Sequence, residues 1–353
     1  MKIPARHSTM KFSNSVRTAV FPVAGMGTRF LPATKATAKE MMPIVDKPLI
    51  QYAVEEALEA GCDRLVFVSG RGKRAIADHF DVAFELEYEL ERCGKKELLE
   101  EVRSIVPRGV STVFLRQPHP LGLGDAVLMT RDVVGDHPFA VLLADDLILA
   151  KKPVLAQMIE QYEHYHAAIL AIQQVPHKET NKYGIIQSWA WENRIHQISN
   201  IIEKPNPDDA PSDLGVVGRY ILPPRIYDYL ENLPAGTGGE IQLTDGIAAL
   251  LKERQVLGFE FEGRRFDCGD KLGYLQATVE YGLRHAGVGT SFAEYLHKLA
   301  TDGICSYIAD KPIALLTRKK KELCSKVVYG RVTTGLNEVA YCCYKGFPTQ
   351  RAT

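Results

Sequence analysis

The chain has 353 residues, of which 46% are hydrophobic and 24% are charged, and its 43 Lys and Arg residues balance its 43 Asp and Glu residues. This composition is typical of a globular protein, and the lack of a basic excess argues against a nucleic-acid partner. No apolar run approaches the roughly 20 residues that a membrane-spanning helix needs, so we expect no membrane partner either.

The N-terminal segment and the cysteines bear on where the protein resides. Residues 1–17 are basic, contain no acidic residue and lack the apolar core of a secretory signal. They fit a flexible tail or a short organellar transit peptide, and translation could start at Met1 or at Met10. The seven cysteines form no C-x-x-C pair, so neither a zinc ribbon nor a thioredoxin motif is predicted. An odd number of cysteines without a secretory signal fits a reducing compartment, and we predict a cytoplasmic protein.

Strand-like and helix-like segments alternate from residue 18 onward. The apolar patterns predict strands at 18–25, 64–70, 111–117 and 139–146, and helices at 48–61, 73–80 and 121–134. In the first helix Pro48 suits the first turn, and Gly61 is a plausible stop. The alternation predicts an α/β fold with a Rossmann-like, mostly parallel but mixed sheet that is flanked by helices.

The pattern loosens in the second half of the chain. Segments 167–175, 183–205 and 214–224 resemble strands of an antiparallel or mixed region, whereas 238–253 and 270–285 return to a helical pattern. After about residue 300 the chain becomes basic and rich in turn residues. We therefore predict one domain over residues 15–300 and a poorly ordered C-terminal tail over residues 301–353.

A glycine-rich loop, "GMGTR" at residues 25–29, follows the first predicted strand. It is not an ATPase phosphate loop, because no Gly-Lys-Ser/Thr follows, and Phe30 stands where the dinucleotide fingerprint needs its third glycine. Glycines let backbone N–H groups approach a phosphate chain, while Arg29 and Lys39 add positive charge. A tight turn with surface cations is the alternative, but the Lys39-Glu40 pair and the nearby prolines favour phosphate binding.

Acidic residues follow two of the apolar strands. Asp145 and Asp146 end "VLLADD", and Asp267 occupies the corresponding place in "FDCGDK". Magnesium bound to a nucleotide takes one or two carboxylates, so we predict Asp145 and Asp267 as its ligands. An Asp after a strand is often a helix N-cap, which is the alternative for Asp145; we expect Asp146 to be such a cap or to support the ligands. Cys268 is expected to pack, because magnesium prefers oxygen.

Glu203 and Lys204 precede Pro205, which predicts an extended backbone at Lys204. Adjacent residues of an extended strand point to opposite faces unless the backbone twists. From the residues alone, an exposed surface pair is the default interpretation.

Residues 19–61 closely resemble the sugar-1-phosphate nucleotidyltransferases, and the resemblance continues through "GLGDAV", "KYGII", "IIEKP", "GGEIQLTD" and "FDCGDKLGYLQATVEYGLRH". It covers roughly residues 18–290 and excludes the tail. Within this family the similarity is greatest to enzymes that use UTP. It implies transfer of a uridylyl group from UTP to α-D-glucose 1-phosphate by magnesium-assisted in-line displacement, giving UDP-glucose and pyrophosphate. We also expect a homo-oligomer.

The resemblance also assigns individual residues. It implies Mg²⁺ on Asp145 and Asp267 and fixed catalytic charges on Arg29, Lys39 and Lys204. It places the nucleotide against Ala24, Gly25, Gly27, Thr28, Gln117 and Gly122, and the sugar phosphate against Gly184, Glu203 and Lys204. Gln117 carries both a donor and an acceptor, as the imide edge of uracil requires.

Two positions depart from the family pattern, and two other functions stay open. The family usually has histidine where this chain has Asp125, and Pro or Gly where it has Ala144. One alternative is an enzyme that makes dTDP- or CDP-glucose. The other is a non-catalytic regulatory paralogue that binds UDP-sugars, although the catalytic lysines and the metal-binding aspartates that such a protein would lack are present.

Overall fold

The computed structural model describes residues 16–234, 236 and 239–301. The described residues 16–289 belong to one compact unit, and a second unit begins at Thr290. The described part of that second unit is most of the helix α11 (Gly289–Thr301). The predicted tail, apart from Thr301, lies outside the described residues, as do residues 1–15 of the basic N-terminal segment.

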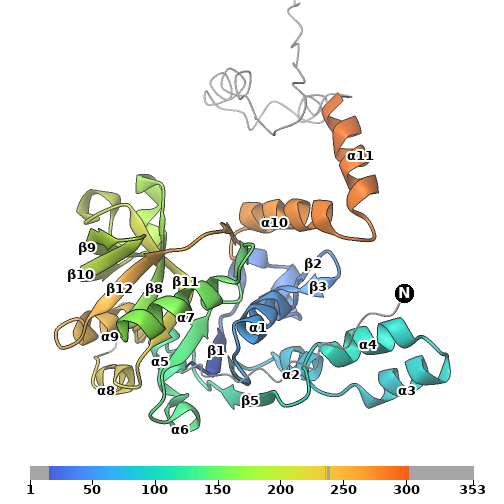
Figure 1. The fold of residues 1–353 in the computed structure, drawn as a ribbon, viewed down its shortest axis with the longest axis horizontal. Coiled ribbons are helices and arrows are strands. Elements are labelled where there is room, and N and C mark those ends of the chain that lie inside the picture. The colour runs from blue at the N-terminus through green and yellow to red at the C-terminus, as the bar shows by residue number, and fades with distance from the viewer. Residues whose placement is uncertain (1–15, 235, 237–238, 302–353) are drawn as a thin grey trace, which may run out of the picture. The chain divides into compact units, whose positions relative to one another are not determined.

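A nine-stranded sheet in the order β5-β4-β1-β6-β11-β8-β12-β10-β9 forms the centre of the first unit (Figure 1). Its strands are β1 (Thr18–Val23), β4 (Arg64–Ser69), β5 (Ser111–Arg116), β6 (Phe139–Leu142), β8 (Ala168–Gln174), β9 (Gly184–Glu192), β10 (Ile195–Glu203), β11 (Leu214–Leu222) and β12 (Val256–Glu260). Two small sheets accompany it, formed by β2 (Pro43–Ile44) with β3 (Lys47–Pro48) and by β7 (Asp146–Leu149) with β13 (Arg264–Asp267).

The helices lie between these strands in the sequence. The α-helices of the first unit are α1 (Leu49–Glu59), α2 (Arg74–Phe80), α3 (Phe84–Arg92), α4 (Lys96–Ser104), α5 (Leu123–Leu128), α6 (Arg131–Val134), α7 (Val154–Tyr165), α8 (Ile226–Glu231), α9 (Leu243–Leu250) and α10 (Lys271–Arg284). Short 3-10 turns are η1 (Thr28–Phe30), η2 (Ala33–Lys35), η3 (Lys39–Met41), η4 (His177–Lys182) and η5 (Pro207–Asp209). None of these described helices, nor α11, is long and apolar enough to cross a membrane.

The predicted mixed sheet is confirmed: four parallel strands lie together at one end, and in the rest β8 and β12 pair in parallel between antiparallel neighbours. Strands β5, β4, β1 and β6 run parallel to one another. β11 is antiparallel to both β6 and β8, and β10 is antiparallel to both β9 and β12. Parallel strands place their carboxyl ends at one edge, so the segments that follow β1, β4, β5 and β6 lie together there.

Alternating side chains of each strand supply two cores, one on each face of the sheet. On β1, Phe21 joins the core covered by α1 and α7, and Val20 joins the core covered by α5, α8 and α9. Phe21 stacks on Phe67 with their ring centroids 5.1 Å apart. Because successive side chains of a strand point to opposite faces, burial on both faces makes these strands continuously apolar.

The predicted helix at 48–61 matches α1, and Gly61 just beyond it has a φ of 95°. Two other predictions differ in detail. The strand expected at 139–146 ends at Leu142, and Asp146 begins β7 in a separate small sheet. The helix expected at 121–134 is divided into α5 and α6.

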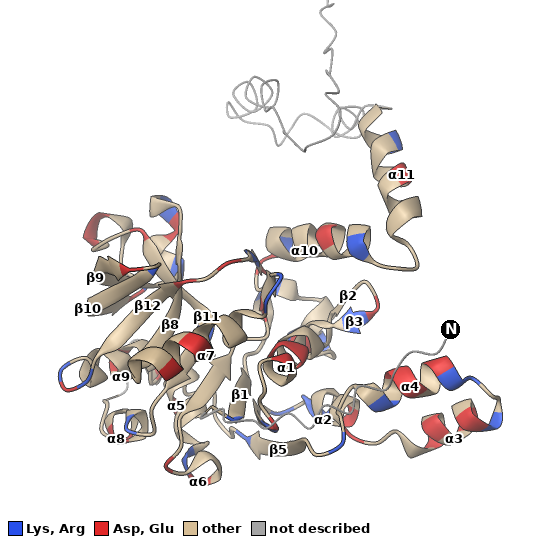
Figure 2. Cartoon of the chain, in the orientation of Figure 1, with Lys and Arg blue, Asp and Glu red and all other residues tan. Residues whose placement is uncertain are grey.

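Acidic and basic side chains are interspersed over the described elements (Figure 2). On α3 and α4, for example, Arg103 donates a hydrogen bond of 2.8 Å to Glu87. Such mixing differs from the one-sided basic face typical of nucleic-acid-binding proteins.

Candidate active site

The glycine loop leaves β1 at the carboxyl edge of the sheet and turns back through η1. Gly27 has a φ of 66°, a conformation that favours glycine, and its carbonyl accepts a hydrogen bond of 2.7 Å from the Thr34 hydroxyl. A Cβ on Gly27 would lie 3.2 Å from the Lys39 Cβ, and one on Gly25 would lie 3.9 Å from the Lys39 Cε. The loop backbone and the Lys39 side chain are therefore adjacent, as a shared phosphate site requires.

Lys39 is held between two acidic groups. Its Nζ lies 2.5 Å from Asp145 Oδ2. The neighbouring residue Glu40 forms a buried ion pair with Lys73, whose Nζ lies 2.7 and 2.8 Å from the two carboxylate oxygens. Burial lowers the pKa of Lys39, but the carboxylates of Asp145 and Glu40 outweigh this and leave that pKa raised. Lys39 is thus a permanent positive charge at this site.

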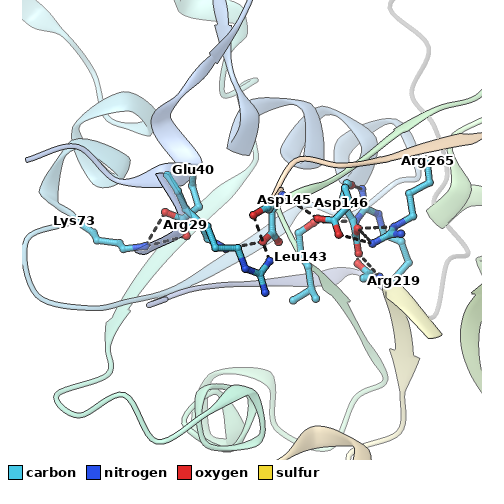
Figure 3. A network of polar contacts seen from close by, with 12 residues as sticks. Arg29, Glu40, Lys73, Leu143, Asp145, Asp146, Arg219 and Arg265 are labelled. Carbon is cyan, nitrogen blue, oxygen red and sulfur yellow. Dashed lines mark hydrogen bonds and ion pairs between the residues drawn. The ribbon is translucent and has the colours of Figure 1, made fainter. Parts of the chain in front are cut away.

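Asp145 and Asp267 converge, although 122 positions separate them. The Cys268 N–H donates 2.7 Å to the Asp145 carbonyl, which draws the two segments together. Asp145 Oδ2 and Asp267 Oδ1 each lie 3.0 Å from the point that a Cβ on Gly269 would occupy, and Arg29 Nη1 lies 3.3 Å from it. Figure 3 shows Arg29 and Asp145 between the Glu40–Lys73 pair and the Asp146–Arg265 pair.

The two carboxylates differ electrostatically. Burial acts to raise the pKa of Asp145, but the Lys39 ammonium and its hydrogen bond hold that pKa below its usual range. Burial, followed by repulsion from Asp146, raises the pKa of Asp267. The charged form of Asp267 is therefore disfavoured in this site, and a bound cation would stabilise it.

Asp146 has a structural position beside these carboxylates. No helix begins there, so the prediction that it caps a helix is wrong. Its Oδ2 accepts a 2.7 Å hydrogen bond from the Gly218 N–H, and its Oδ1 accepts one of 2.5 Å from Arg265 Nε. Arg265 Nη2 remains 3.9 Å from Asp267 Oδ2. Asp146 thus fixes the Arg265 guanidinium, which also forms a longer ion pair with Asp267, and this agrees with the other expectation, a supporting residue.

The buried side chain of Arg219, which is 1% exposed, stabilises the bend between β6 and β7. It donates to the carbonyls of Leu143 and Asp146 at 3.0 and 2.9 Å and pairs with Glu56 at 2.7 Å. Because a buried guanidinium needs several acceptors, this network also positions the backbone on both sides of Asp145.

The backbone at Lys204 is not extended, so that prediction is wrong. Its φ is 46°, in the left-handed region, although it precedes Pro205. The turn brings the Lys204 and Glu203 side chains to the same side, with Nζ 2.9 Å from Oε1. Glu203 Oε2 also accepts a 2.6 Å hydrogen bond from the Thr244 hydroxyl. Adjacent side chains of an extended strand would point to opposite faces, and the left-handed backbone at Lys204 is what places these two on the same side.

A cavity of about 260 Å³ lies between the glycine loop, the converging carboxylates and the Glu203–Lys204 turn. Of the predicted residues, those that line it are Arg29, Asp145, Gly184, Glu203, Lys204 and Asp267. A Cβ on Gly184 would stand 3.4 Å from the Thr244 hydroxyl and 3.5 Å from Glu203 Oε2, so the absence of a side chain leaves room beside this pair.

The cavity also contains residues that the sequence interpretation missed, namely Lys182, Tyr183, Glu240, Gln242, Thr244 and Arg265. All but the last lie in or next to the quoted motifs "KYGII" and "GGEIQLTD", so the motifs could have pointed to them. Arg265 directly precedes the motif that begins at Phe266, but nothing in the sequence pairs it with Asp146, which is distant along the chain.

The other predicted nucleotide-binding residues lie beyond this cavity, on the side of the parallel strands. They are Ala24, Gly25, Gly27, Thr28, Gln117 and Gly122. The Ala24 carbonyl would be 3.0 Å from a Cβ on Gly70, which follows β4, and Gln117 follows β5. These segments thus meet at the edge of the parallel strands. Cys268 is buried in an apolar cluster as expected, and its pKa is raised to about 12, chiefly by burial.

A glycine loop with two cations, a pair of converging carboxylates and a mixed α/β sheet together define a nucleotidyltransferase. The family model "Nucleotidyl transferase" matches residues 19–282, and the chain belongs to this family.

Known proteins agree with this assignment. The chain is 48% identical over 290 residues to a UTP–glucose-1-phosphate uridylyltransferase of Streptococcus pyogenes, and the match covers 80% of this chain and 94% of that protein. A UTP-bound UGPase from Acinetobacter baumannii matches with a TM-score of 0.76 and 44% identity over 80% of this chain and 99% of the other. A UDP-glucose pyrophosphorylase complexed with UDP-glucose matches with a TM-score of 0.71 and 42% identity, covering 76% and 100% of the two chains. The predicted family resemblance is confirmed.

Proposed function

We propose that this protein is a UTP–glucose-1-phosphate uridylyltransferase, which converts UTP and α-D-glucose 1-phosphate to UDP-glucose and pyrophosphate. The observation that carries the proposal is the convergence of Arg29, Asp145, Asp267 and Lys204 on one cavity. The relatives and the UTP-bound and UDP-glucose-bound structures that the chain resembles support the same reaction.

The chemistry requires no protein base. The nucleophile is a phosphate oxygen of glucose 1-phosphate that is ionised at neutral pH, and it attacks the α-phosphorus of UTP. The bond from that phosphorus to the bridging oxygen breaks, and pyrophosphate leaves with the electron pair. Positioning and charge stabilisation dominate such transfers.

The charged side chains divide between the two substrates. Arg29 belongs to the glycine loop and the Lys39 side chain lies against it, so they stabilise the triphosphate and the charge that develops on pyrophosphate. Lys204 lies beside Glu203 and holds the attacking phosphate, while Glu203 and the space at Gly184 accommodate the glucose.

We also propose that the enzyme uses Mg²⁺, with Asp145 and Asp267 as its protein ligands. The donor set fits, because both groups are carboxylates whose oxygens converge near Gly269. Among the described residues no group of three or more His, Cys, Asp or Glu side chains forms a metal site, which suits a cation carried partly by phosphate oxygens. Bound there, Mg²⁺ would neutralise phosphate charge.

The test is a pyrophosphate-release assay with glucose 1-phosphate and each of UTP, dTTP and CTP in turn. We expect UTP to be the best substrate, with no turnover after chelation of divalent cations. Preference for dTTP or CTP would favour the alternative pyrophosphorylases. Binding of UDP-glucose without turnover of any nucleotide would favour a regulatory paralogue. Such a protein is expected to lack the catalytic charges, whereas all of them are present in this chain.

Two further properties belong to the proposal. We place the enzyme in the cytoplasm, which agrees with the free state of the described cysteines Cys62, Cys93 and Cys268. We also expect a homo-oligomer, which sedimentation of the full chain would test.

A further inference from the structure

Gln117 lies at the edge of the parallel strands with its side-chain amide held by two groups. The residue is 4% exposed, and its backbone N–H donates 2.9 Å to the Ser69 carbonyl. Its Nε2 donates to the Gly122 carbonyl at 3.2 Å and to Asp125 Oδ2 at 2.6 Å. Among the described residues, nothing donates to its Oε1.

The chemistry of the two partners determines which way the amide faces. A backbone carbonyl and an ionised carboxylate only accept hydrogen bonds, and the amide of Gln117 has two N–H donors. If the amide turned over, Oε1 would face both acceptors, and both hydrogen bonds would be lost. Nε2 therefore faces the protein, and Oε1 is the group of Gln117 that is left for a ligand.

The partners themselves are held rigidly. Gly122 has a φ of 95°, and a Cβ there would lie 2.8 Å from the Ile241 carbonyl. The Gly124 N–H donates 2.8 Å to that same carbonyl, and the Ile241 N–H donates 2.7 Å to Leu121. Asp125 lies in the first turn of α5, directly after this locked segment. The backbone that carries the Gly122 carbonyl and Asp125 is thus held in place.

The charges around the cavity show which ligand group meets Gln117. A phosphate needs cations, and those that line the cavity are Arg29, Lys182, Lys204 and Arg265, with Lys39 against the glycine loop. The Gln117 amide is itself uncharged and suits a neutral base, whereas the Asp125 carboxylate beside it would repel a phosphate. With the proposed UTP bound, the base therefore lies toward Gln117, and its ring edge meets Oε1.

An acceptor at this position distinguishes pyrimidines at ring atom N3. Uracil and thymine carry an N3–H, which can donate to Oε1. Cytosine has a lone pair on N3, so two acceptors would face each other. A site built to accept an N–H rejects analogues that lack it, because its buried polar group is then left unpaired.

We propose that Asp125 is a positioning residue that fixes the Gln117 amide with Oε1 toward the base, and so selects pyrimidines with an N3–H over cytosine. This inference rests on the proposed function. Unlike histidine, the residue usual in the family at this position, an ionised aspartate only accepts hydrogen bonds and so faces an amide N–H.

The test compares kcat/KM for UTP and CTP in wild type and in Asp125→Asn. Asparagine has nearly the same shape but can donate as well as accept, so the Gln117 amide can turn toward cytosine. We expect the UTP preference over CTP to fall by about 10-fold to 100-fold, while turnover of UTP falls less. Asp136→Asn, at an exposed aspartate after α6, is the control and should leave the ratio unchanged.

Two additional measurements keep the result decisive. Asp125→Ala, which removes the carboxylate that accepts from Nε2, should relax the preference in the same direction, and it serves if the asparagine variant fails to fold. Wild type should bind 3-methyluridine triphosphate, which lacks the N3–H, much more weakly than UTP in calorimetry, and Asp125→Asn should narrow that difference.

An unchanged UTP/CTP ratio in folded Asp125 variants, or equal binding of UTP and the methylated analogue by wild type, overturns the proposal. Failure of wild type to turn over UTP refutes the proposed function instead, and calorimetric binding of the same nucleotides then still decides the role of Asp125.

Discussion

The buried ion pair beside the glycine loop gives a quantitative prediction for Lys73→Met. In the native protein the Lys73 and Glu40 side chains are 8% and 2% exposed, and Lys73 Nζ contacts both carboxylate oxygens. Methionine keeps much of the volume but removes the ammonium, so the Glu40 carboxylate remains buried without its direct partner. Lys39, the other cation that acts on Glu40, is itself engaged by Asp145.

The expected cost is large for a single substitution. Breaking a buried pair by removal of one partner lowers the free energy of unfolding by about 3–5 kcal/mol. The matched control is Arg92→Met, which breaks an ion pair of the same 2.7 Å length with Glu89 on the surface of α3, where the side chains are 60% and 55% exposed. That loss should be below about 1 kcal/mol.

The dependence on pH separates a charge effect from a packing effect. Burial raises the pKa of Glu40 in the folded protein, and Lys73 counteracts this rise. Without Lys73 the folded-state pKa rises further above the unfolded value, so the folded state retains a proton that the unfolded state loses. Stability therefore decreases as pH rises between these two values, and the cost of Lys73→Met should be smaller at about pH 5 than at about pH 8.

Urea unfolding followed by circular dichroism measures these differences. The double variant Glu40→Leu/Lys73→Met, which removes both charges, should recover most of the stability lost in the single variant. A cost of Lys73→Met no greater than that of Arg92→Met, or one independent of pH, would refute the argument that an unpaired buried carboxylate is responsible.

The other predictions concern turnover. Asp145→Asn and Asp267→Asn should each lower kcat by at least about 10²-fold. Asp146→Asn, which weakens the ion pair with Arg265, should lower kcat by about tenfold. Equal losses of kcat at all three positions in the pyrophosphate-release assay would contradict the choice of ligands. Lys39→Ala and Lys204→Ala should each cost about 10²–10³ in rate, but Lys39→Ala should weaken UTP binding in calorimetry and Lys204→Ala should instead raise the KM for glucose 1-phosphate. Loss of UTP binding in the Lys204 variant alone would reverse these two assignments.

Local patterns in the sequence were sufficient for the fold class and for part of the site. Alternating apolar segments predicted the mixed α/β sheet, because burial on a sheet or helix face leaves a period that can be read without knowing the partner. The glycine loop, Asp145 and Asp267 were predicted because each follows an apolar strand, and the ends of neighbouring strands meet at one edge. The family resemblance then added the substrates.

Only the tertiary structure decided how the remaining groups meet. Pro205 favours an extended neighbour, yet Lys204 adopts a left-handed conformation beside Glu203, and its N–H donates 2.9 Å to the Tyr183 carbonyl. Arg265 pairs with Asp146 across 119 positions of sequence. Side-chain pairing depends on distances in space, which neither local propensity nor periodicity records. For the same reason the sequence alone assigns no role to Asp125, whereas the structure places its carboxylate 2.6 Å from the Gln117 amide.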